Sequence, residues 1–188
     1  CLIMAAGNAS RFGSNKLAAK VDGKMLIEHA LETVPHEEFA RVTVVTQYDE
    51  VLVLARRFGF TVLVNPFPEW GASHTVRLGT EAMADCDAIL YQVADQPLLR
   101  RESVRAEVEF FRRHPDRIVA MGHGGVRGNP CIFPARFFPE LTALEGDRGG
   151  SAVIRRHEDA LTLFEISPDE LRDVDTPMAL AALRDTLA

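Results

Sequence analysis

Residues 5–16 read Ala5-Ala6-Gly7-Asn8-Ala9-Ser10-Arg11-Phe12-Gly13-Ser14-Asn15-Lys16, and they follow directly on the apolar run Cys1-Leu2-Ile3-Met4. This order predicts a β-strand that leads into a glycine loop ending in a lysine. Small side chains let backbone N–H groups approach a polyphosphate, and Arg11 and Lys16 add positive charge where its phosphates would lie. The stretch therefore indicates a nucleotide-binding loop.

The spacing of this loop argues against two commoner phosphate-binding motifs. A Walker loop needs Gly-x4-Gly-Lys-Ser/Thr, whereas five residues separate Gly7 from Gly13 here and Leu17 follows Lys16. A dinucleotide-binding fingerprint needs Gly-x-Gly, and Ala9 occupies the place of its second glycine. A nicotinamide-dependent dehydrogenase is therefore disfavoured.

Composition indicates one soluble domain with a full core, since 47% of the 188 residues are hydrophobic. We expect no membrane partner, because no run of about 18 apolar residues and no basic leader occurs. The formal charge of −6 offers no basic face for nucleic acid. Three cysteines without a C-x-x-C pair are typical of reduced thiols in the cytoplasm. The sequence starts at Cys1, inside the first strand, so we expect a few residues to precede it.

Apolar β-branched runs alternate with amphipathic stretches along the chain. The runs predict strands at 42–46, 61–64, 88–93 and 118–121, and a period of 3.6 residues predicts helices at 25–33, 50–58, 75–83, 103–113 and 177–187. The alternation predicts an α/β fold, a three-layer α/β/α Rossmann-like domain with a mostly parallel sheet. Ligands of such sheets bind at the carboxyl ends of the strands, so the residues that follow each strand are the candidates for a site.

The pattern loosens between residues 121 and 165. Residues 122–128 are rich in glycine, and 129–133 predict a short strand with Pro130 near its start, where proline is tolerated. We expect a single domain over residues 1–188. Residues 1–121 would bind the nucleotide, and 122–188 would form an excursion for a second substrate together with an acidic motif near the C-terminus.

Asp95 follows the apolar strand predicted at 88–93. A carboxylate at that edge of the sheet can hold Mg²⁺ against phosphates, since Mg²⁺ favours one or two carboxylates together with phosphate oxygens. The structural alternative is an Asx-turn before Pro97. The two alternatives predict opposite results when the charge of Asp95 is removed.

A second acidic pair lies in Leu171-Arg172-Asp173-Val174-Asp175-Thr176-Pro177. Thr176 before Pro177 is explained as the N-cap of a helix with proline at its first position. The aspartates are not needed for that purpose, and their i, i+2 spacing points both carboxylates the same way on an extended segment. We favour Asp175 as a metal ligand with Asp173 assisting.

Residues 66–79 form a third candidate segment, with Ser73 or Thr75 as the expected cap of the helix at 75–83. A structural duty is sufficient to explain both hydroxyls. We give His74 no part in the mechanism, and we interpret Trp70 as a packing residue, with stacking on a ligand ring as the alternative.

Taken together, these stretches resemble the MobA-like nucleotidyltransferases over nearly the whole chain, and within them most closely the molybdenum cofactor cytidylyltransferases. Residues 5–16 are similar to the signature Leu-Ala-Ala-Gly-x-Ser-x-Arg-Met-Gly-x-x-Lys, although Ala9 replaces a serine. Residues 94–99 resemble the Gly-Asp-Met/Gln-Pro motif, and 171–177 resemble Asp-Ile-Asp-Thr-Pro-Glu-Asp, with Met178 and Ala179 in place of the final acidic pair. The start Ala5-Ala6-Gly7 matches the cytidine-using branch, because guanosine-using relatives tend to have Ala-Gly-Gly.

The resemblance implies transfer of CMP from CTP to the terminal phosphate of molybdopterin, with release of pyrophosphate and a requirement for Mg²⁺ or Mn²⁺. It implies that Asp95 and Asp175 bind the metal and that Arg11 and Lys16 are catalytic. The residues implied to contact the nucleotide are Ala5, Ala6, Gly7, Asn8, Arg11, Lys16, Ser73 and Asp95. A molybdenum hydroxylase or its chaperone is an implied partner.

The acceptor motifs are the least similar part. Residues 128–130 and 146–151 resemble Gly-His/Asn-Pro and Gly-Asp-x-Gly-Ala-Arg, which implies that Asn129 and Asp147 contact the acceptor. Gly150 and Ser151 replace Ala-Arg, which removes a cation suited to the acceptor's phosphate. Turn formation alone is the alternative explanation of both motifs.

Other functions stay open on the sequence alone. One is transfer to a different phosphorylated acceptor, such as a sugar phosphate, and another is guanylyl transfer to molybdopterin. A third, from a different class, is a nucleotide-binding chaperone for molybdenum hydroxylases that binds without turnover. Release of pyrophosphate separates the enzymes from the chaperone.

Overall fold

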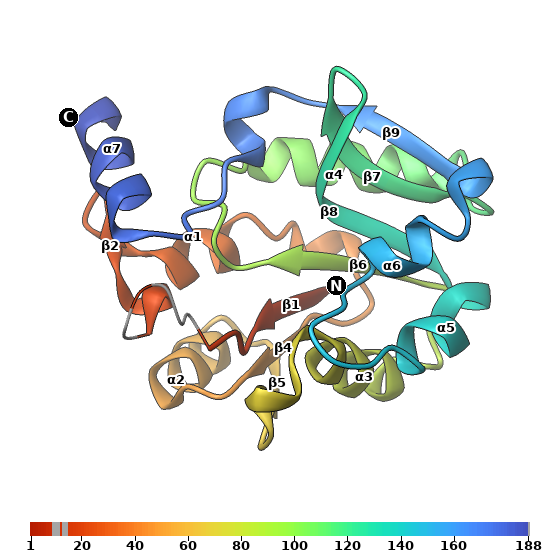
Figure 1. Ribbon diagram of the computed structural model, residues 1–188, viewed down its shortest axis with the longest axis horizontal. Helices are drawn as coiled ribbons and strands as arrows, with labels where there is room; N and C mark the ends of the chain where they lie inside the picture. The colour runs from red at the N-terminus through yellow and green to blue at the C-terminus, as the bar shows by residue number, and fades with distance from the viewer. Residues whose placement is uncertain (9–11, 13–14, 188) are drawn as a thin grey trace.

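A single seven-stranded sheet organises the computed structural model, which describes residues 1–8, 12 and 15–187 (Figure 1). The spatial order of the strands is β5-β4-β1-β6-β8-β7-β9. β8 runs antiparallel to both of its neighbours, and the other adjacent pairs are parallel. The bounds are β1 Leu2–Ala5, β4 Thr43–Thr46, β5 Thr61–Val64, β6 Ala88–Val93, β7 Ile118–His123, β8 Val126–Pro134 and β9 Leu161–Glu165.

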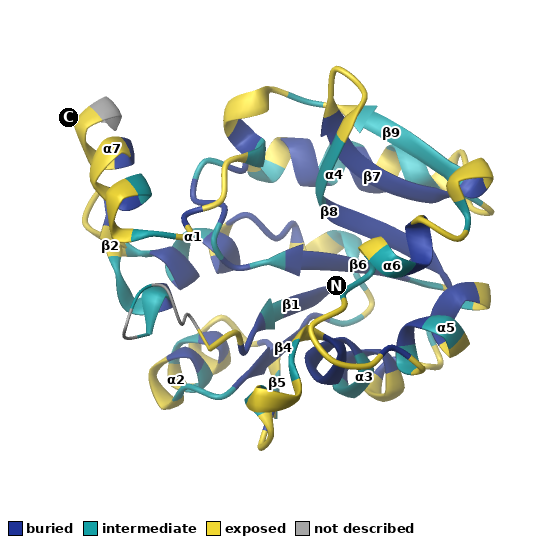
Figure 2. Cartoon of the chain, viewed as in Figure 1, coloured by how far each residue is buried: buried dark blue, intermediate teal, exposed yellow. Residues whose placement is uncertain are grey.

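Helices cover both faces of this sheet. α1 (Leu26–Glu32), α2 (Asp49–Arg57) and α4 (Arg101–Arg112) pack on one face, whereas α3 (Ala72–Ala82), α5 (Phe138–Thr142) and α6 (Ser151–Ile154) pack on the other. Successive residues of β1 serve the two faces in turn, with Ile3 in the first core and Leu2 in the second. Figure 2 shows the central strands β6, β7 and β8 largely buried, whereas the edge strand β9 is half-buried. The predicted three-layer α/β/α architecture is confirmed.

A smaller unit joins the two ends of the chain. The hairpin of β2 (Lys20–Val21) and β3 (Lys24–Met25) packs against α7 (Pro177–Leu187), around Val21, Leu180 and Leu183. The Arg184 guanidinium donates hydrogen bonds of 2.8 and 2.6 Å to the carbonyl oxygen of Lys20, and Figure 1 shows α7 beside β2. The segment before α7 is therefore held close to the segment that follows the glycine loop.

The remaining elements are short 3-10 helices that connect the longer ones. They are η1 Lys16–Ala18, η2 His36–Glu38, η3 Pro68–Trp70, η4 Ala135–Phe137, η5 Glu158–Ala160 and η6 Pro168–Leu171. In the ranges that the structure describes, no helix has both the length and the apolar character needed to cross a membrane.

The predicted strands and helices are present, with their ends shifted by at most three residues. The strand predicted at 118–121 continues to His123, and the hairpin β2–β3 and the strand β9 were not predicted. β9 lies at the edge of the sheet, and four of its five residues are only half-buried. Such a strand lacks the sharp apolar–polar alternation from which strands are predicted.

The strand predicted at 129–133 is longer than expected, and Pro130 lies inside it rather than near its start. Register explains how the proline is tolerated. Cys131 pairs with Ala120 and Arg127 pairs with Gly122, so the pairing of β8 with β7 is irregular at the residues between. Proline lacks an N–H donor, and a local break in the ladder is where a strand can accept one.

The start of α3 also differs from the prediction. The helix begins at Ala72, with Gly71 as its N-cap, so Ser73 and Thr75 lie inside it and neither caps it. Gly71 has a φ of 85°, and a Cβ there would lie 2.6 Å from the carbonyl oxygen of Gly146. The backbone N–H of Ser73, in the first turn of α3, donates a hydrogen bond of 3.2 Å to the carbonyl oxygen of Gly146. Close approach of two loops therefore takes the place of a local side-chain cap.

Gly79 gives a test of the packing between α3 and β1. A Cβ at this position would lie 2.3 Å from a methyl carbon of Leu2, which is fully buried and has no free space to enter. Alanine improves helix propensity by about 0.5–1 kcal/mol, but overpacking of a core costs about 1–3 kcal/mol. We expect Gly79→Ala to lower the free energy of unfolding, measured by urea denaturation. Gly149→Ala is the matched control, because a Cβ there meets nothing within 4 Å.

Candidate active site

The loop after β1 is held from the end of the neighbouring strand β4. Gln47 donates from Nε2 to the carbonyl oxygen of Ala6 at 2.9 Å and to Oδ1 of Asn8 at 3.0 Å, and the Tyr48 hydroxyl donates to the carbonyl oxygen of Gly7 at 2.7 Å. A Cβ at Gly7 would meet nothing within 4 Å, so the backbone here borders open space. Sequence reasoning missed Gln47 and Tyr48, because their role depends on the pairing of β1 with β4.

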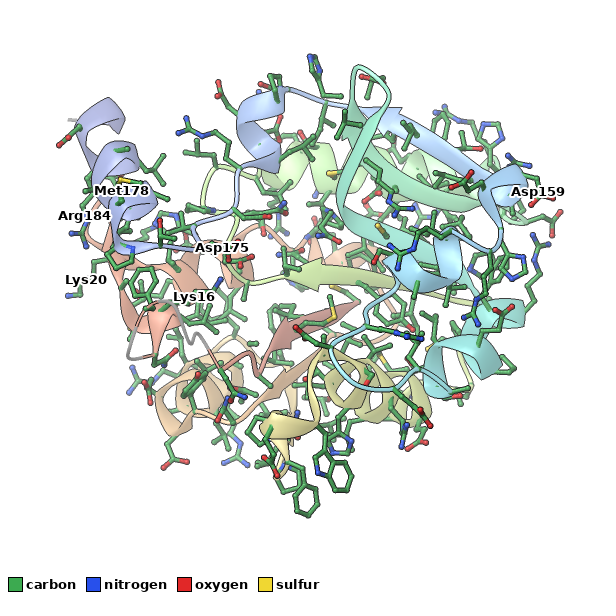
Figure 3. All side chains as sticks on the ribbon, viewed as in Figure 1. Lys16, Lys20, Asp159, Asp175, Met178 and Arg184 are labelled. Atoms are coloured by element: carbon green, nitrogen blue, oxygen red, sulfur yellow. The ribbon has the colours of Figure 1, made fainter. Side chains whose placement is uncertain are left out.

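Lys16 brings two of the predicted acidic residues together. Its Nζ lies 2.5 Å from Oδ2 of Asp95 and 2.9 Å from Oδ1 of Asp175. The side chains of Lys16 and Asp95 are 16% and 17% exposed, whereas that of Asp175 is 51% exposed. Figure 3 shows Lys16 and Asp175 facing one another at the end of the molecule where α7 lies. The predicted cation and the two predicted metal ligands therefore form one cluster.

The charges in this cluster shift two pKa values. Burial alone would lower the pKa of Lys16, but the charges and hydrogen bonds of Asp95 and Asp175 outweigh burial and raise it. Desolvation, followed by the negative charge of Asp95, raises the pKa of Asp173 to about 6. Lys16 is therefore a fixed cation, and Asp173 gains its charge less readily than an ordinary aspartate.

A backbone hydrogen bond holds the acidic segment 171–177 beside Asp95. Val174 N–H bonds to the carbonyl oxygen of Asp95 at 2.9 Å, which ties the segment before α7 to the residue after β6. As predicted, Thr176 caps α7, since its Oγ1 accepts the N–H of Ala179 at 3.1 Å. The Asx-turn considered for Asp95 has no support, because its buried Oδ1 has no hydrogen-bond partner among the described residues.

This cluster has the chemistry of a partial site for a divalent cation. Asp95 and Asp175 approach one point from two segments, and the Oδ1 atom of Asp95 is left without a partner in the described part of the chain. The described residues contain no group of three or more His, Cys, Asp or Glu side chains arranged to hold a metal. Mg²⁺ does not need such a group, because it is commonly bound by one or two carboxylates together with the phosphates of a substrate.

A cavity of about 660 Å³ opens beside the cluster. Its lining includes Ala6, Gly7 and Asn8 from the loop, together with Lys16 and Asp175. The carboxyl ends of β1 and β6 border it, as expected for a sheet of this kind. The cavity therefore joins residues of the predicted nucleotide loop to two residues of the cluster.

Not all predicted nucleotide contacts lie on this cavity. Ala5 is buried in β1, and Ser73 is buried and donates to the carbonyl oxygen of Trp70 at 3.5 Å. These two residues and Asp95 are not among the residues lining the cavity in the described part of the chain. Thr75 takes the place expected for Ser73. Arg11, predicted as a catalytic cation, lies outside the described residues.

A second cavity of about 160 Å³ adjoins the first, since Met4 lines both. Asn129 lines the second cavity, whereas Asp147 lines the first, so the two predicted acceptor residues lie in different cavities. Asp147 also has a structural contact, because its Oδ1 accepts the N–H of Ala72 at the start of α3 at 3.3 Å. Sequence reasoning missed this contact, as the two residues are 75 positions apart.

Trp70 differs from its predicted packing role. It is 51% exposed, lines the first cavity and stacks on the exposed Phe67, with ring centroids 4.5 Å apart. His74 packs its ring against the edge of Trp70 at 4.9 Å, and its two ring nitrogens have no partner among the described residues. The aromatic pair therefore forms part of the rim of the first cavity.

The contact of Asp147 with α3 predicts an effect on stability. Loss of a side-chain cap costs about 0.5–2 kcal/mol, so Asp147→Ala should lower the free energy of unfolding by about that amount. Asp147→Asn keeps an acceptor oxygen and should remain near the wild type. Thermal and urea unfolding of both variants measure this effect. An unchanged stability of the alanine variant, with a raised KM for the acceptor, would instead assign Asp147 to ligand binding alone.

Comparison with known proteins shows the family and the fold of the chain. Purine catabolism protein PucB from Bacillus subtilis is 27% identical over 94% of this chain and 91% of its own length. A probable molybdenum cofactor guanylyltransferase from Thermococcus sibiricus is 30% identical over 58% of this chain and 54% of its own length. The solved structure of a nucleotidyl transferase from Methanothermobacter thermautotroptrophicus has a TM-score of 0.81 at 22% identity, over 98% of this chain and 95% of that one. Residues 1–161 match the MobA-like NTP transferase domain, and the chain belongs to this family.

Proposed function

We propose that this protein transfers CMP from CTP to the terminal phosphate of a molybdopterin-type acceptor and releases pyrophosphate. One observation carries the proposal: Lys16, Asp95 and Asp175 form one cluster, and Lys16 and Asp175 line the first cavity together with Ala6, Gly7 and Asn8 of the loop. A cation and two carboxylates at the edge of a glycine loop suit a triphosphate and its accompanying metal ion. Family membership supports nucleotidyl transfer as the class of reaction.

The reaction needs no nucleophile from the protein, because the acceptor's phosphate is already an oxyanion. Its oxygen attacks the α-phosphorus in line, the bond from that phosphorus to the bridging oxygen breaks, and pyrophosphate leaves with the electron pair. Catalysis then consists of alignment and charge stabilisation. Lys16 has a flexible stem and a fixed positive charge, so it can turn from the carboxylates to the phosphate oxygens that gain charge.

The carboxylates are proposed to hold Mg²⁺, or Mn²⁺ in its place. Asp95 and Asp175 would be the ligands, with Asp173 nearby, and the bound ion would neutralise charge on the phosphates. Lys16 balances the two carboxylates when no metal is bound. Asp95 is the better-placed ligand, because it is the more buried of the two.

Ala6 supports the choice of CTP. It is 3% exposed, belongs to the core on the α3 face of the sheet and lines the first cavity, so this position carries a methyl group where a glycine would leave more room. A steric difference of this kind contributes about 1–3 kcal/mol to the choice between a pyrimidine and a purine. Guanylyl transfer is the second candidate, and it is favoured by the name of the Thermococcus sibiricus relative.

A substrate screen tests the proposed function directly. The four nucleoside triphosphates are combined with molybdopterin or with common sugar phosphates, and pyrophosphate release is measured. We expect CTP with molybdopterin to give the highest kcat/KM. A higher value for GTP would reassign the reaction to guanylyl transfer, and nucleotide binding without pyrophosphate release from any combination would indicate a binding protein.

Asp95→Asn tests the proposed metal ligand, since the amide keeps the shape of the side chain and removes its charge. We expect turnover to fall about 100-fold or more, the scale seen when one electrostatic stabiliser is lost, while circular dichroism and the melting temperature show a folded protein. Asp169→Asn is the control, because this exposed aspartate in η6 is not among the residues of the cluster. Near-normal turnover of Asp95→Asn would remove Asp95 from the metal site.

A further inference from the structure

One face of β8 forms a row of side chains that ends in a cation. Alternate residues of a strand point to the same face, and Arg127, Asn129, Cys131 and Phe133 all line the second cavity. β8 runs antiparallel to β6 and β7, so its first residues lie at the carboxyl ends of those strands. Arg127, which pairs with Gly122 near the end of β7, is therefore at the edge of the sheet where ligands bind.

The charge of this cavity differs from that of its neighbour. Arg127 is the one charged residue among the described residues that line it, and no carboxylate is among them. Burial raises the pKa values of the Cys131 thiol and the Tyr91 hydroxyl, so both groups stay neutral. The first cavity, in contrast, has Glu69, Asp147 and Asp175 in its lining.

The Arg127 guanidinium is available to a ligand. Within the described residues it forms no hydrogen bond and no ion pair, and its side chain is half-buried. The one nearby carboxyl that influences Cys131 is Glu107, which is fully buried in α4, and burial raises its pKa well above the ordinary value. Burial thus disfavours the charged form of Glu107, and no ion pair joins it to Arg127 among the described residues.

The lining also defines the shape of a fitting ligand. Phe133, Tyr91 and Ile154 give the cavity an apolar lining, and Asn129 and Ser151 add polar side chains to it. A guanidinium binds carboxylate and phosphate groups through paired hydrogen bonds. The ligand class is thus a compact molecule with a largely apolar or ring-shaped body and an anionic group at one end.

We propose that Arg127 binds an anionic group of the acceptor at the edge of the second cavity, with Asn129 and Ser151 as hydrogen-bonding neighbours. Arg127 is then a specificity-determining residue for the acceptor and not for the nucleotide, because the nucleotide loop lines the other cavity. The acceptor lies across the point where the two cavities meet at Met4. The inference rests on the proposed function only in taking the second cavity as the acceptor site.

Binding of small probes tests this assignment without turnover. The probes are pterin-6-carboxylate, pterin without the acidic group, and glucose 1-phosphate, titrated by calorimetry into the wild type, Arg127→Met and Arg127→Lys. Arg148→Met is the matched control, because Arg148 is an exposed arginine of the neighbouring 146–150 loop outside the lining of either cavity in the described part of the chain. CTP is titrated into each protein, and the melting temperature of each is recorded.

We expect the wild type to bind pterin-6-carboxylate about tenfold or more tightly than pterin, the scale of one hydrogen bond to a charged group. Arg127→Met should abolish that preference, Arg127→Lys should keep part of it, and Arg148→Met should keep all of it. CTP affinity should be unchanged in each case. These results would support Arg127 as the anion-binding residue.

Four other outcomes would change these conclusions. An unchanged preference in Arg127→Met, or no binding of either acidic probe to the wild type, would overturn the inference. If glucose 1-phosphate binds in an Arg127-dependent way and neither pterin binds, the role of Arg127 stands, and the pterin acceptor of the proposed function is wrong. If Arg127→Met loses both CTP binding and probe binding, the inference is also overturned, because the effect would not be confined to the acceptor cavity.

Discussion

The ion pairs of Lys16 with Asp95 and Asp175 are the contacts on which the proposed site depends. They join three segments that are distant in sequence: the end of the glycine loop, the residue after β6 and the turn before α7. Two carboxylates near one point repel each other, so a cation between them is needed whenever the segments approach. Lys16 supplies that cation from the protein itself, which allows the segments to meet before any ligand binds.

The sheet determines where those segments can meet. Parallel pairing of β1 with β4 and β6 aligns their carboxyl ends. The residues that follow these strands include the glycine loop, the proposed metal ligand Asp95, and Gln47 and Tyr48, which hydrogen-bond to the loop. β8 reverses the direction, so it brings the beginning of a strand to the same edge. A single antiparallel strand therefore adds Arg127 and Asn129 beside a site otherwise built from strand ends.

Sequence alone predicted the parts of this arrangement that depend on local pattern. The apolar runs and helical periods identified the layers, and the loop and the two acidic motifs identified Lys16, Asp95 and Asp175. Contacts between distant segments were not predictable in this way. The cap of α3 by Asp147 and the hold of Tyr48 on Gly7 join residues 75 and 41 positions apart. Ser73 was the predicted nucleotide contact, whereas Thr75 lines the cavity; the start of α3 is set by Gly71 and Gly146, which no local capping signal reveals.

The two cavities differ in the charge of their lining residues, and this difference fits two substrates of different charge. The first combines Lys16 with several carboxylates, a mixture that suits a polyphosphate accompanied by a metal ion. The second has Arg127 and neutral groups, so it favours an anion that brings no metal. An acceptor that reached the first cavity alone would meet the negative charge of Asp147 and Asp175. The proposed anchoring at Arg127 would offset that repulsion with a positive charge outside the first cavity.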